Sequence, residues 1–168
     1  LWYGRQQITA SSNRIQRATA LLGMAVFITI LSGGFVAGLK AGLAYNTFPL
    51  MDGRWVPDVI FLQEPWWRNF FENIATVQFD HRVLATLTFL GVIILWGSGM
   101  RQQLSAAVRN SLHLLLAAAL LQVTLGISTL LLHVPIVLAA AHQGGALLLL
   151  TAVIYAHKRM TATAPAGK

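Results

Sequence analysis

The chain has 168 residues, of which 56% are hydrophobic and 10% charged, and its mean hydropathy is +0.64. An average soluble domain carries roughly 25% charged residues, so this composition excludes an ordinary soluble globule, and its hydrophobicity excludes a disordered chain. The net charge of +7 does not indicate nucleic-acid binding, because the basic residues flank apolar segments, and the absence of cysteine excludes disulfides and thiolate metal sites.

The spacing of the charged residues predicts four membrane-spanning helices. Three stretches contain no charged residue: 22 positions after Arg17, 18 after Arg82 and 48 after Arg109. A spanning helix needs about 20 mainly apolar residues, so the longest stretch is two helices separated at 133–135, where Pro135 favours a helix start. We expect an all-α integral membrane protein, a single four-helix bundle over 1–168 with a long outer loop between its first two spans. The spans are predicted at about 17–39, 76–99, 108–132 and 136–157.

The basic residues predict the orientation of this bundle. Eight of them, with no acidic residue, lie in the N-terminal arm, the connection between the second and third spans, and the C-terminal tail: Arg5, Arg14, Arg17, Arg101, Arg109, Lys158, Arg159 and Lys168. All five acidic residues lie in or beside the outer loop. Because short cytoplasmic segments are rich in Lys and Arg, we expect a bacterial inner-membrane protein with cytoplasmic termini, or a mitochondrial inner-membrane protein with matrix termini.

Aromatic residues in the outer loop predict contact with the membrane interface. Trp66, Trp67 and Phe70 belong to a segment, 66–74, that we expect to form a short helix at headgroup level. Two interpretations stay open, an interfacial anchor alone or a lid over a site in the outer leaflet. Along the first helix, Gly34, Gly38 and Gly42 recur at a spacing of four residues, which favours close helix packing.

Two of the five histidines are candidate ligands. Ionisable residues inside spans are rare and are functional hypotheses by default. By helix rise, His81 lies about 30 Å and His142 about 24 Å from the inner membrane boundary, so both reach a similar depth in the outer half. The other three are interpreted as interfacial or loop residues: His113, His133 and His157.

Two imidazoles at matched depth on different helices are what bis-histidine haem ligation requires. Arg82 follows His81 and is a candidate partner for a propionate, and the glycines after His142 leave room for a macrocycle. The alternative is a haem-free membrane assembly or packing protein whose two histidines make only hydrogen bonds between helices.

A series of motifs carries a resemblance to a known family. The segments, in order, are GGFVAGLKAG at 33–42, YNTFPLM at 45–51, EN at 72–73, VQFDHR at 77–82, QVTLGI at 122–127 and AHQ at 141–143. In this order and spacing they resemble the C-terminal half of haem A synthase, over about residues 20–157. The first residue is leucine instead of methionine, and we expect the chain to be a fragment of a longer protein.

The resemblance implies an oxidoreductase that converts haem O to haem A, by oxidising the C8 methyl of the porphyrin to a formyl group for use in cytochrome c oxidase. It implies two four-helix halves related by a pseudo-twofold axis, of which the C-terminal half holds haem b. The family histidines correspond to His81 and His142, with Arg82 and Gln143 beside them as cofactor-binding residues. The implied partners are membrane lipid, haem O as substrate, haem O synthase, cytochrome oxidase assembly factors, and a second four-helix half or another copy of the chain.

One residue departs from the pattern of the family's substrate half, where a glutamate lies three residues before the first histidine. Here that residue is Gln78, on the same helical face as His81. Glutamine cannot take up a proton as a carboxylate does, so we expect this half to relay electrons, and the catalytic residue of methyl oxidation is not identified. The alternative function is a cytochrome-b-like electron carrier with two histidine ligands and no methyl oxidation of its own.

Overall fold

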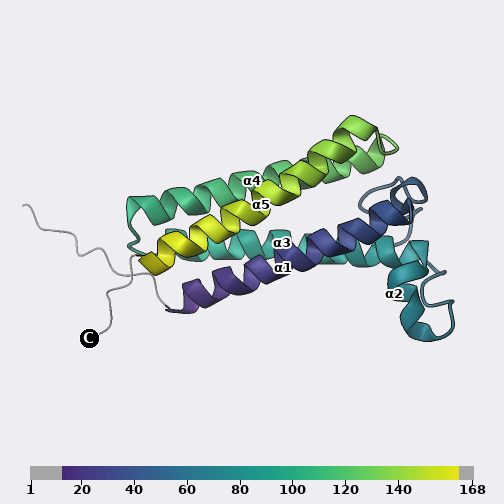
Figure 1. The fold of residues 1–168 in the computed structure, drawn as a ribbon, viewed down its shortest axis with the longest axis horizontal. Helices are drawn as coiled ribbons and strands as arrows, with labels where there is room; N and C mark the ends of the chain where they lie inside the picture. Colours follow the sequence, from purple (N-terminus) through teal and green to yellow (C-terminus); the bar gives the residue numbers. More distant parts are fainter. Residues whose placement is uncertain (1–12, 163–168) are drawn as a thin grey trace, which may run out of the picture.

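The computed structural model describes residues 13–162, and within that range the chain is a bundle of long helices (Figure 1). The four long helices are α1 (Asn13–Gly38), α3 (Ile74–Met100), α4 (Ala106–Leu131) and α5 (Ile136–Ala162). Each is long and apolar enough to cross a membrane, which confirms the predicted all-α membrane bundle. The chain is therefore a multi-pass membrane protein. The described helices α1 and α5 extend about one turn beyond the predicted spans, because their basic residues lie on helix that continues past the apolar segment.

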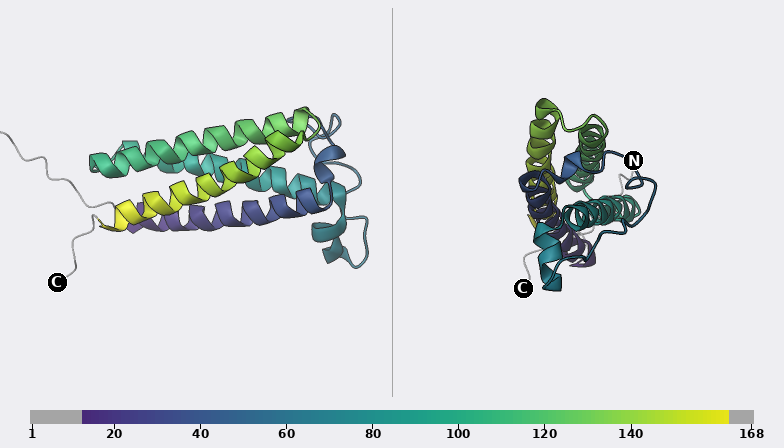
Figure 2. Two further views of the ribbon diagram at one scale, coloured as in Figure 1. Left: turned by 45° about the horizontal axis from the view of Figure 1, so that its top comes forward. Right: turned by 90° about the vertical axis from the view of Figure 1, so that its right-hand side faces the viewer.

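The four helices occupy the corners of a square. Helix α1 packs against α3 and α5, and α4 packs against the same two helices. The end-on view in Figure 2 shows the same order, which leaves α3 and α5 as a diagonal pair. Neighbouring helices in such a bundle have axes about 8–10 Å apart, so diagonal axes are roughly 11–14 Å apart. A group held between α3 and α5 would therefore lie in the centre of the bundle.

Local signals set the helix boundaries. The side chain of Asn73 caps α3 by accepting hydrogen bonds from the backbone N–H groups of Ala75 and Thr76. Ser105 caps α4 in the same way. The turn between α4 and α5 lies at the predicted break, where His133 and Val134 have φ values of 60° and 59°. This left-handed backbone is unusual for a β-branched residue and ends α4 abruptly.

The two ends of the bundle differ in character. Asn13, Ala162 and the connection between α3 and α4 lie together at one end, here called the basic end (Figure 1). The long connection 39–73 and the turn between α4 and α5 lie at the opposite end, here called the loop end. Basic side chains cluster at the first of these ends, as the sequence predicts.

The apolar core occupies the half of the bundle nearest the basic end. Its buried members come from all four helices and the α3–α4 connection: Ile15, Leu22, Val26, Val92, Leu95, Leu104, Val108, Leu112, Leu115, Ala119, Leu149, Ala152, Val153 and Met160. Among the described residues, this cluster does not reach the half nearest the loop end. That half therefore holds the bundle together by other contacts, and it is the half that contains the two candidate histidines.

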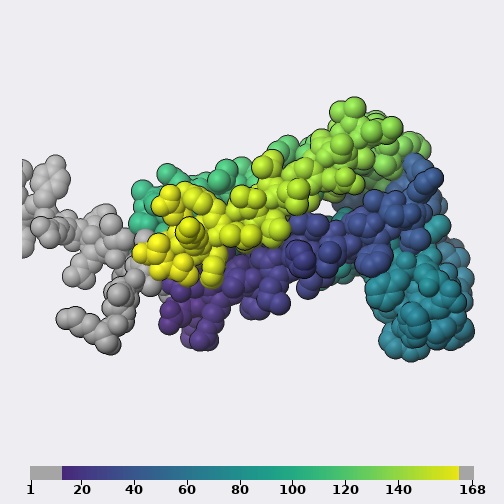
Figure 3. Space-filling model, viewed as in Figure 1, coloured from purple at the N-terminus to yellow at the C-terminus, as the bar shows by residue number. Residues whose placement is uncertain are grey.

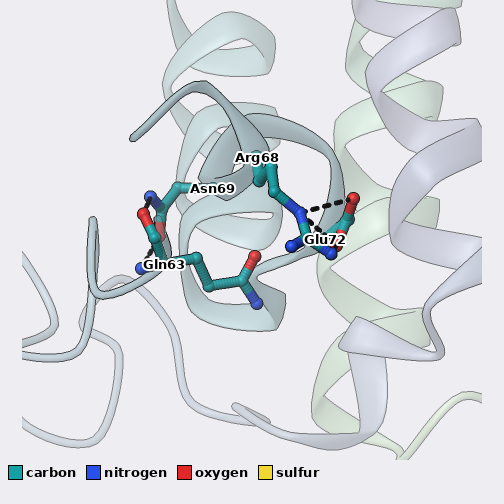
Figure 4. A network of polar contacts seen from close by, with 4 residues as sticks. All are labelled: Gln63, Arg68, Asn69 and Glu72. Atoms are coloured by element: carbon teal, nitrogen blue, oxygen red, sulfur yellow. Dashed lines mark hydrogen bonds and ion pairs between the residues drawn. The ribbon is translucent and has the colours of Figure 1, made fainter. Parts of the chain in front are cut away.

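A network around one asparagine gives the loop its shape (Figure 4). Asn69 is fully buried, and its side chain accepts from the Gln63 N–H at 2.9 Å and donates to the carbonyls of Gln63 and Trp66, both at 2.8 Å. Beside this network, an exposed ion pair joins Arg68 to Glu72. The hydrogen bond that Arg68 donates lowers the pKa of the Glu72 carboxyl. A loop with a buried, satisfied polar centre has a defined position beside the bundle.

The aromatic segment forms a short helix that ends earlier than predicted. Residues 66–68 form the 3₁₀ helix η2 and residues 69–72 form α2, after which Asn73 is extended. Trp66 and Trp67 are 65% and 51% exposed, and Phe71 packs edge-on against Phe35 of α1 at 5.4 Å. Figure 1 shows α2 beside the α1–α3 side of the bundle, away from α4 and α5. This position favours the interpretation of the segment as an interfacial anchor.

Candidate functional site

Residues from all four long helices meet at one level of the bundle, here called the histidine layer: Ser32, Gly33, His81, Gly126 and His142. At 1.5 Å of rise per residue, each lies roughly 7–10 Å inside its helix from the loop end. His81 comes from α3 and His142 from α5, the diagonal pair. The depth match predicted for the two histidines is therefore found in the structure, and α1 and α4 supply the residues between them.

His81 is held by α1. Its Nδ1 atom lies 2.8 Å from the hydroxyl oxygen of Ser32. A methyl group built on Gly33 would lie 3.1 Å from the His81 Cε1 atom, closer than most real contacts of that kind. Ser32 and Gly33 therefore act together, because one orients the imidazole and the other leaves space for it.

His142 is held differently, by α4. A methyl group built on Gly126 would lie 2.8 Å from the His142 Cε1 atom, so only glycine fits there without a shift. One turn away, the side-chain amide of Gln122 donates to the His142 backbone carbonyl at 3.0 Å. The Nδ1 atom of His142 is buried and has no hydrogen-bond partner among the described residues. A buried polar atom without a partner costs about 1–3 kcal/mol and is rare in native structures, so it requires an explanation.

The geometry suits a flat group held between two imidazoles. The apolar core does not extend to this level, and the space-filling view in Figure 3 shows a gap between α1 and α5 toward the loop end. Within residues 13–162 no cluster of three or more His, Cys, Asp or Glu side chains could hold a bare metal ion. A prosthetic group that brings its own equatorial ligands needs only the two imidazoles that the layer offers.

The loop covers the histidine layer through contacts with α3. The Arg82 guanidinium donates to the backbone carbonyls of Tyr45 at 2.9 Å, Thr47 at 2.9 Å and Leu50 at 3.2 Å. Gln78, one turn earlier on the same helix, donates to the Tyr45 carbonyl at 3.0 Å. Residues 45–50, not the aromatic segment 66–72, are thus tied to the turn of α3 that carries His81.

The remaining candidates are dispersed. Gln78 is buried close to the layer, with its Oε1 atom unpartnered, whereas Gln143 is exposed on the bundle surface. Nδ1 of His113 accepts from the indole N–H of Trp96 at 3.1 Å in the half nearest the basic end. His133 lies in the turn between α4 and α5, and His157 lies near the basic end of α5. Neither belongs to the histidine layer.

Sequence reasoning missed two residues that hold the histidines and misplaced two glycines. Ser32 carried no signal and Gln122 entered only through the motif at 122–127, because one hydroxyl and one amide in apolar segments look like ordinary interhelical polar residues. Gly34, Gly38 and Gly42 were expected to allow close helix packing. A side chain on either of the first two would meet nothing within 4 Å, whereas one on Gly42 would lie 3.1 Å from the Val134 side chain. Helix α1 is rotated so that Gly33, their neighbour, is the glycine in contact.

Comparison with known proteins finds one family and many relatives. The family described as "Cytochrome oxidase assembly protein", COX15-CtaA, matches residues 2–154. "Heme A synthase" of Nitrosospira multiformis is 54% identical over 142 residues, which are 84% of this chain and 40% of that protein. "Heme A synthase COX15" of Arabidopsis thaliana is 43% identical over 152 residues, 90% of this chain and 33% of that protein. The human protein of the same name is 48% identical over 130 residues, 77% of this chain and 32% of that protein. The chain thus spans between about a third and two fifths of the length of these curated relatives.

The contacts of Arg82 lead to a prediction about the loop. Arg82→Gln removes the charged donor to three backbone carbonyls within 3.2 Å and to a fourth, that of Pro49, at 3.5 Å, and hydrogen bonds to charged groups are worth about 1.5–3 kcal/mol. We expect amide hydrogen exchange in residues 45–50 to accelerate by about 10- to 100-fold, with exchange in α4 unchanged. Arg54→Gln is the matched control, because Arg54 lies in the same loop and is paired only with exposed Asp58. Unchanged exchange at 45–50 in Arg82→Gln would contradict this role.

Proposed function

This chain belongs to the COX15-CtaA family of cytochrome oxidase assembly proteins, and we propose that its histidine layer binds a haem b through His81 and His142. The observation that carries the proposal is the placement of two imidazoles at one level on diagonal helices, with a glycine against each ring. Two axial imidazoles define a bis-histidine haem site, and facing helices of a bundle are where such sites are built.

The residues of the layer fit such a group. Nδ1 of His142 has no hydrogen-bond partner among the described residues, so no contact at that nitrogen fixes which nitrogen of the ring is free for iron. The glycines at 33 and 126 let both rings stand close to the neighbouring backbones, which leaves the central space to a ligand. A haem bound there would supply reversible one-electron chemistry. The protein's own part is to hold two neutral imidazoles at the right depth and to cover them with residues 45–50.

The role of Arg82 and Gln143 follows from their surroundings. Arg82 is adjacent to His81 at the rim of the layer, but its terminal nitrogens are engaged with loop carbonyls. Its pairing with a propionate therefore stays a prediction that would require these contacts to be shared or exchanged. Gln143 is exposed, and its predicted contact with the cofactor would require the side chain to reach around α5.

We infer for the whole protein the activity in its relatives' name, the oxidation of the haem O methyl group to the formyl group of haem A. In that reaction this chain would relay electrons to a second four-helix unit, supplied by the same polypeptide or by another copy. Gln78 supports this division, because the buried group three residues before His81 is an amide and not a carboxylate. The second candidate, an electron carrier with no methyl oxidation of its own, is favoured by the same residue.

The proposed setting is the inner membrane of a bacterium, or that of a mitochondrion in a eukaryote. The basic end would face the cytoplasm or the matrix, and the loop end would face outward, since short cytoplasmic segments are rich in Lys and Arg. The exposed apolar side chains of all four helices would contact lipid. The proposed partners are haem O synthase, which makes the substrate, and cytochrome oxidase assembly factors, which receive the product.

The proposed ligands can be tested by spectroscopy. The purified protein should show the sharp reduced α and β bands of a low-spin haem b, and His81→Ala or His142→Ala should abolish them because each removes one axial ligand. His113→Ala and His157→Ala are the matched controls, because they remove histidines of the membrane helices that lie outside the histidine layer. Both should retain the spectrum. A normal bis-histidine spectrum in both single variants at 81 and 142 would overturn the assignment.

A second prediction concerns the space beside His142. Gly126→Ala places a methyl group against that imidazole, so we expect the haem to dissociate about 10-fold faster. Substitutions beside a metal ligand typically reduce metal affinity by about 10- to 100-fold, and this value is at the lower end of that range. Gly34→Ala is the matched control, because Gly34 is exposed and its methyl group would meet nothing within 4 Å. Its effect should stay within about twofold, as for most surface substitutions. Transfer of haem to apomyoglobin measures both rates, and equal rates would contradict the role of Gly126.

The division of labour can be tested with the substrate. Residues 1–168 should be expressed alone in a membrane, supplied with haem O, and the extracted haem analysed by chromatography. We expect bound haem b and no hydroxylated haem or haem A, because the buried group near the iron site is Gln78. Conversion without a second four-helix unit of different sequence would show that the methyl is oxidised in this half. The companion measurement, Gln78→Glu, should change the haem spectrum or potential without creating conversion, since a buried acid tends to stay protonated.

A further inference from the structure

Ser32 makes two hydrogen bonds with one proton. Its hydroxyl oxygen lies 2.8 Å from the backbone carbonyl oxygen of Thr29 and 2.8 Å from Nδ1 of His81. A carbonyl oxygen can only accept, so the Ser32 proton is used on Thr29. The hydroxyl oxygen is then the acceptor in the second hydrogen bond, and the donor is Nδ1 of His81. This contact is consistent only with an imidazole that carries its proton on Nδ1.

We propose that Ser32 is a positioning residue, which holds His81 in the Nδ1–H tautomer and leaves the lone pair of Nε2 free for iron. A neutral imidazole has one protonated and one unprotonated nitrogen, and only the unprotonated one can bind a metal. The nitrogen bound to the metal is selected by the hydrogen bond that the other one makes. The use of Nε2 toward iron rests on the proposed function, whereas the tautomer is a property of the protein alone.

The surroundings of Ser32 fix the ring as well as the proton. Gly33 lies against the Cε1 atom, so the imidazole is confined between a hydroxyl and a glycine backbone. One turn deeper, the hydroxyl of Thr29 contacts that of Thr88 at 3.0 Å and donates to the Ala25 carbonyl at 2.8 Å. The Thr29–Thr88 contact joins α1 to α3 at a second level, which sets the register that brings Ser32 opposite His81.

The two candidate ligands are therefore not equivalent. His81 donates a hydrogen bond from Nδ1, which increases the basicity of Nε2. No hydroxyl contacts Nδ1 of His142 among the described residues, and that ring is hydrogen-bonded instead to the backbone of Gln122 and confined by Gly126. We expect His81 to be the stronger electron donor of the pair, and the layer to favour the ferric state more than it would with two unpartnered imidazoles.

Nitrogen-15 NMR of histidine-labelled intact protein tests the tautomer without haem. The chain contains its own reference, because the indole N–H of Trp96 donates to Nδ1 of His113 and so requires the opposite, Nε2–H tautomer there. We expect the Nδ1–H pattern for His81 and its retention in Ser32→Thr, which keeps the hydroxyl. In Ser32→Ala the share of that tautomer should fall, because only the hydrogen bond to the Thr29 backbone remains. The pattern of His113 should be the same in all three proteins. An Nε2–H pattern for His81 in the unaltered protein would overturn the proposal.

The haem-loaded protein gives a second measurement. Ser32→Ala should raise the midpoint potential, because a less basic Nε2 stabilises ferric iron less, and haem should dissociate about 10-fold faster. Ser111→Ala is the matched control, since it also removes a hydroxyl that donates to the carbonyl three residues earlier, but in the half of the bundle nearest the basic end. The same potential in Ser32→Ala and the unaltered protein would overturn the proposal. The Nδ1–H tautomer in a protein that binds no haem would instead uphold the role of Ser32 and overturn the proposed function.

Discussion

The bilayer requires that every polar group within a span find a partner inside the protein, and this constraint explains how the chain distributes its residues. The half of the bundle nearest the basic end meets it by containing few polar side chains, and there the buried apolar cluster holds the helices together. The other half concentrates hydroxyls, amides and imidazoles at one level, where they partner one another. Several buried side-chain atoms still lack a hydrogen-bond partner among the described residues, and Nδ1 of His142 is the one that belongs to a candidate ligand.

The same constraint governs the loop, whose backbone carbonyls lie where water becomes scarce. Arg82 and Gln78 satisfy three of them from α3, and Asn46 ties the loop to α4 by donating to the Leu130 carbonyl at 2.9 Å. Because Arg82 is the residue after His81, the cover and the candidate ligand share one helical turn. A shift of the loop therefore acts directly on that turn, whereas the aromatic anchor at 66–72 is separated from it by the buried Asn69 network.

The sequence of a membrane helix predicts its length and the depth of its residues, but it does not predict the rotation of the helix about its axis. Length without charge gave the four spans, Pro135 gave the break between the last two, and helix rise gave the matched depth of His81 and His142. Helix rotation could not be predicted, because lipid and protein interior are both apolar and the spans have no clear polar face. For this reason the contacts of Ser32 and Gly33 with His81 were missed. Gly34, the next residue, and Gly38, one turn further, were expected to pack instead. The contacts of Arg82 depend on the path of the loop, and the hydrophobic periodicity of the sequence does not predict the path of a loop.

The chemistry of the layer bears on the proposed division between electron transfer and methyl oxidation. Asp80 and Arg82 flank His81 on α3, and the Arg82 guanidinium is engaged with loop carbonyls. The side chains hydrogen-bonded to the two ligand residues are the hydroxyl of Ser32 and the amide of Gln122, which, like the buried amide of Gln78, stay neutral at any physiological pH. With both imidazoles bound to iron, none of these groups would exchange a proton when the iron changes oxidation state. An electron relay needs no such exchange, but hydroxylation of a methyl group requires protons to be delivered and removed at defined atoms. On the proposed function, the residues of this layer are suited to the first task, and the second belongs to a site that contains an acid or a base.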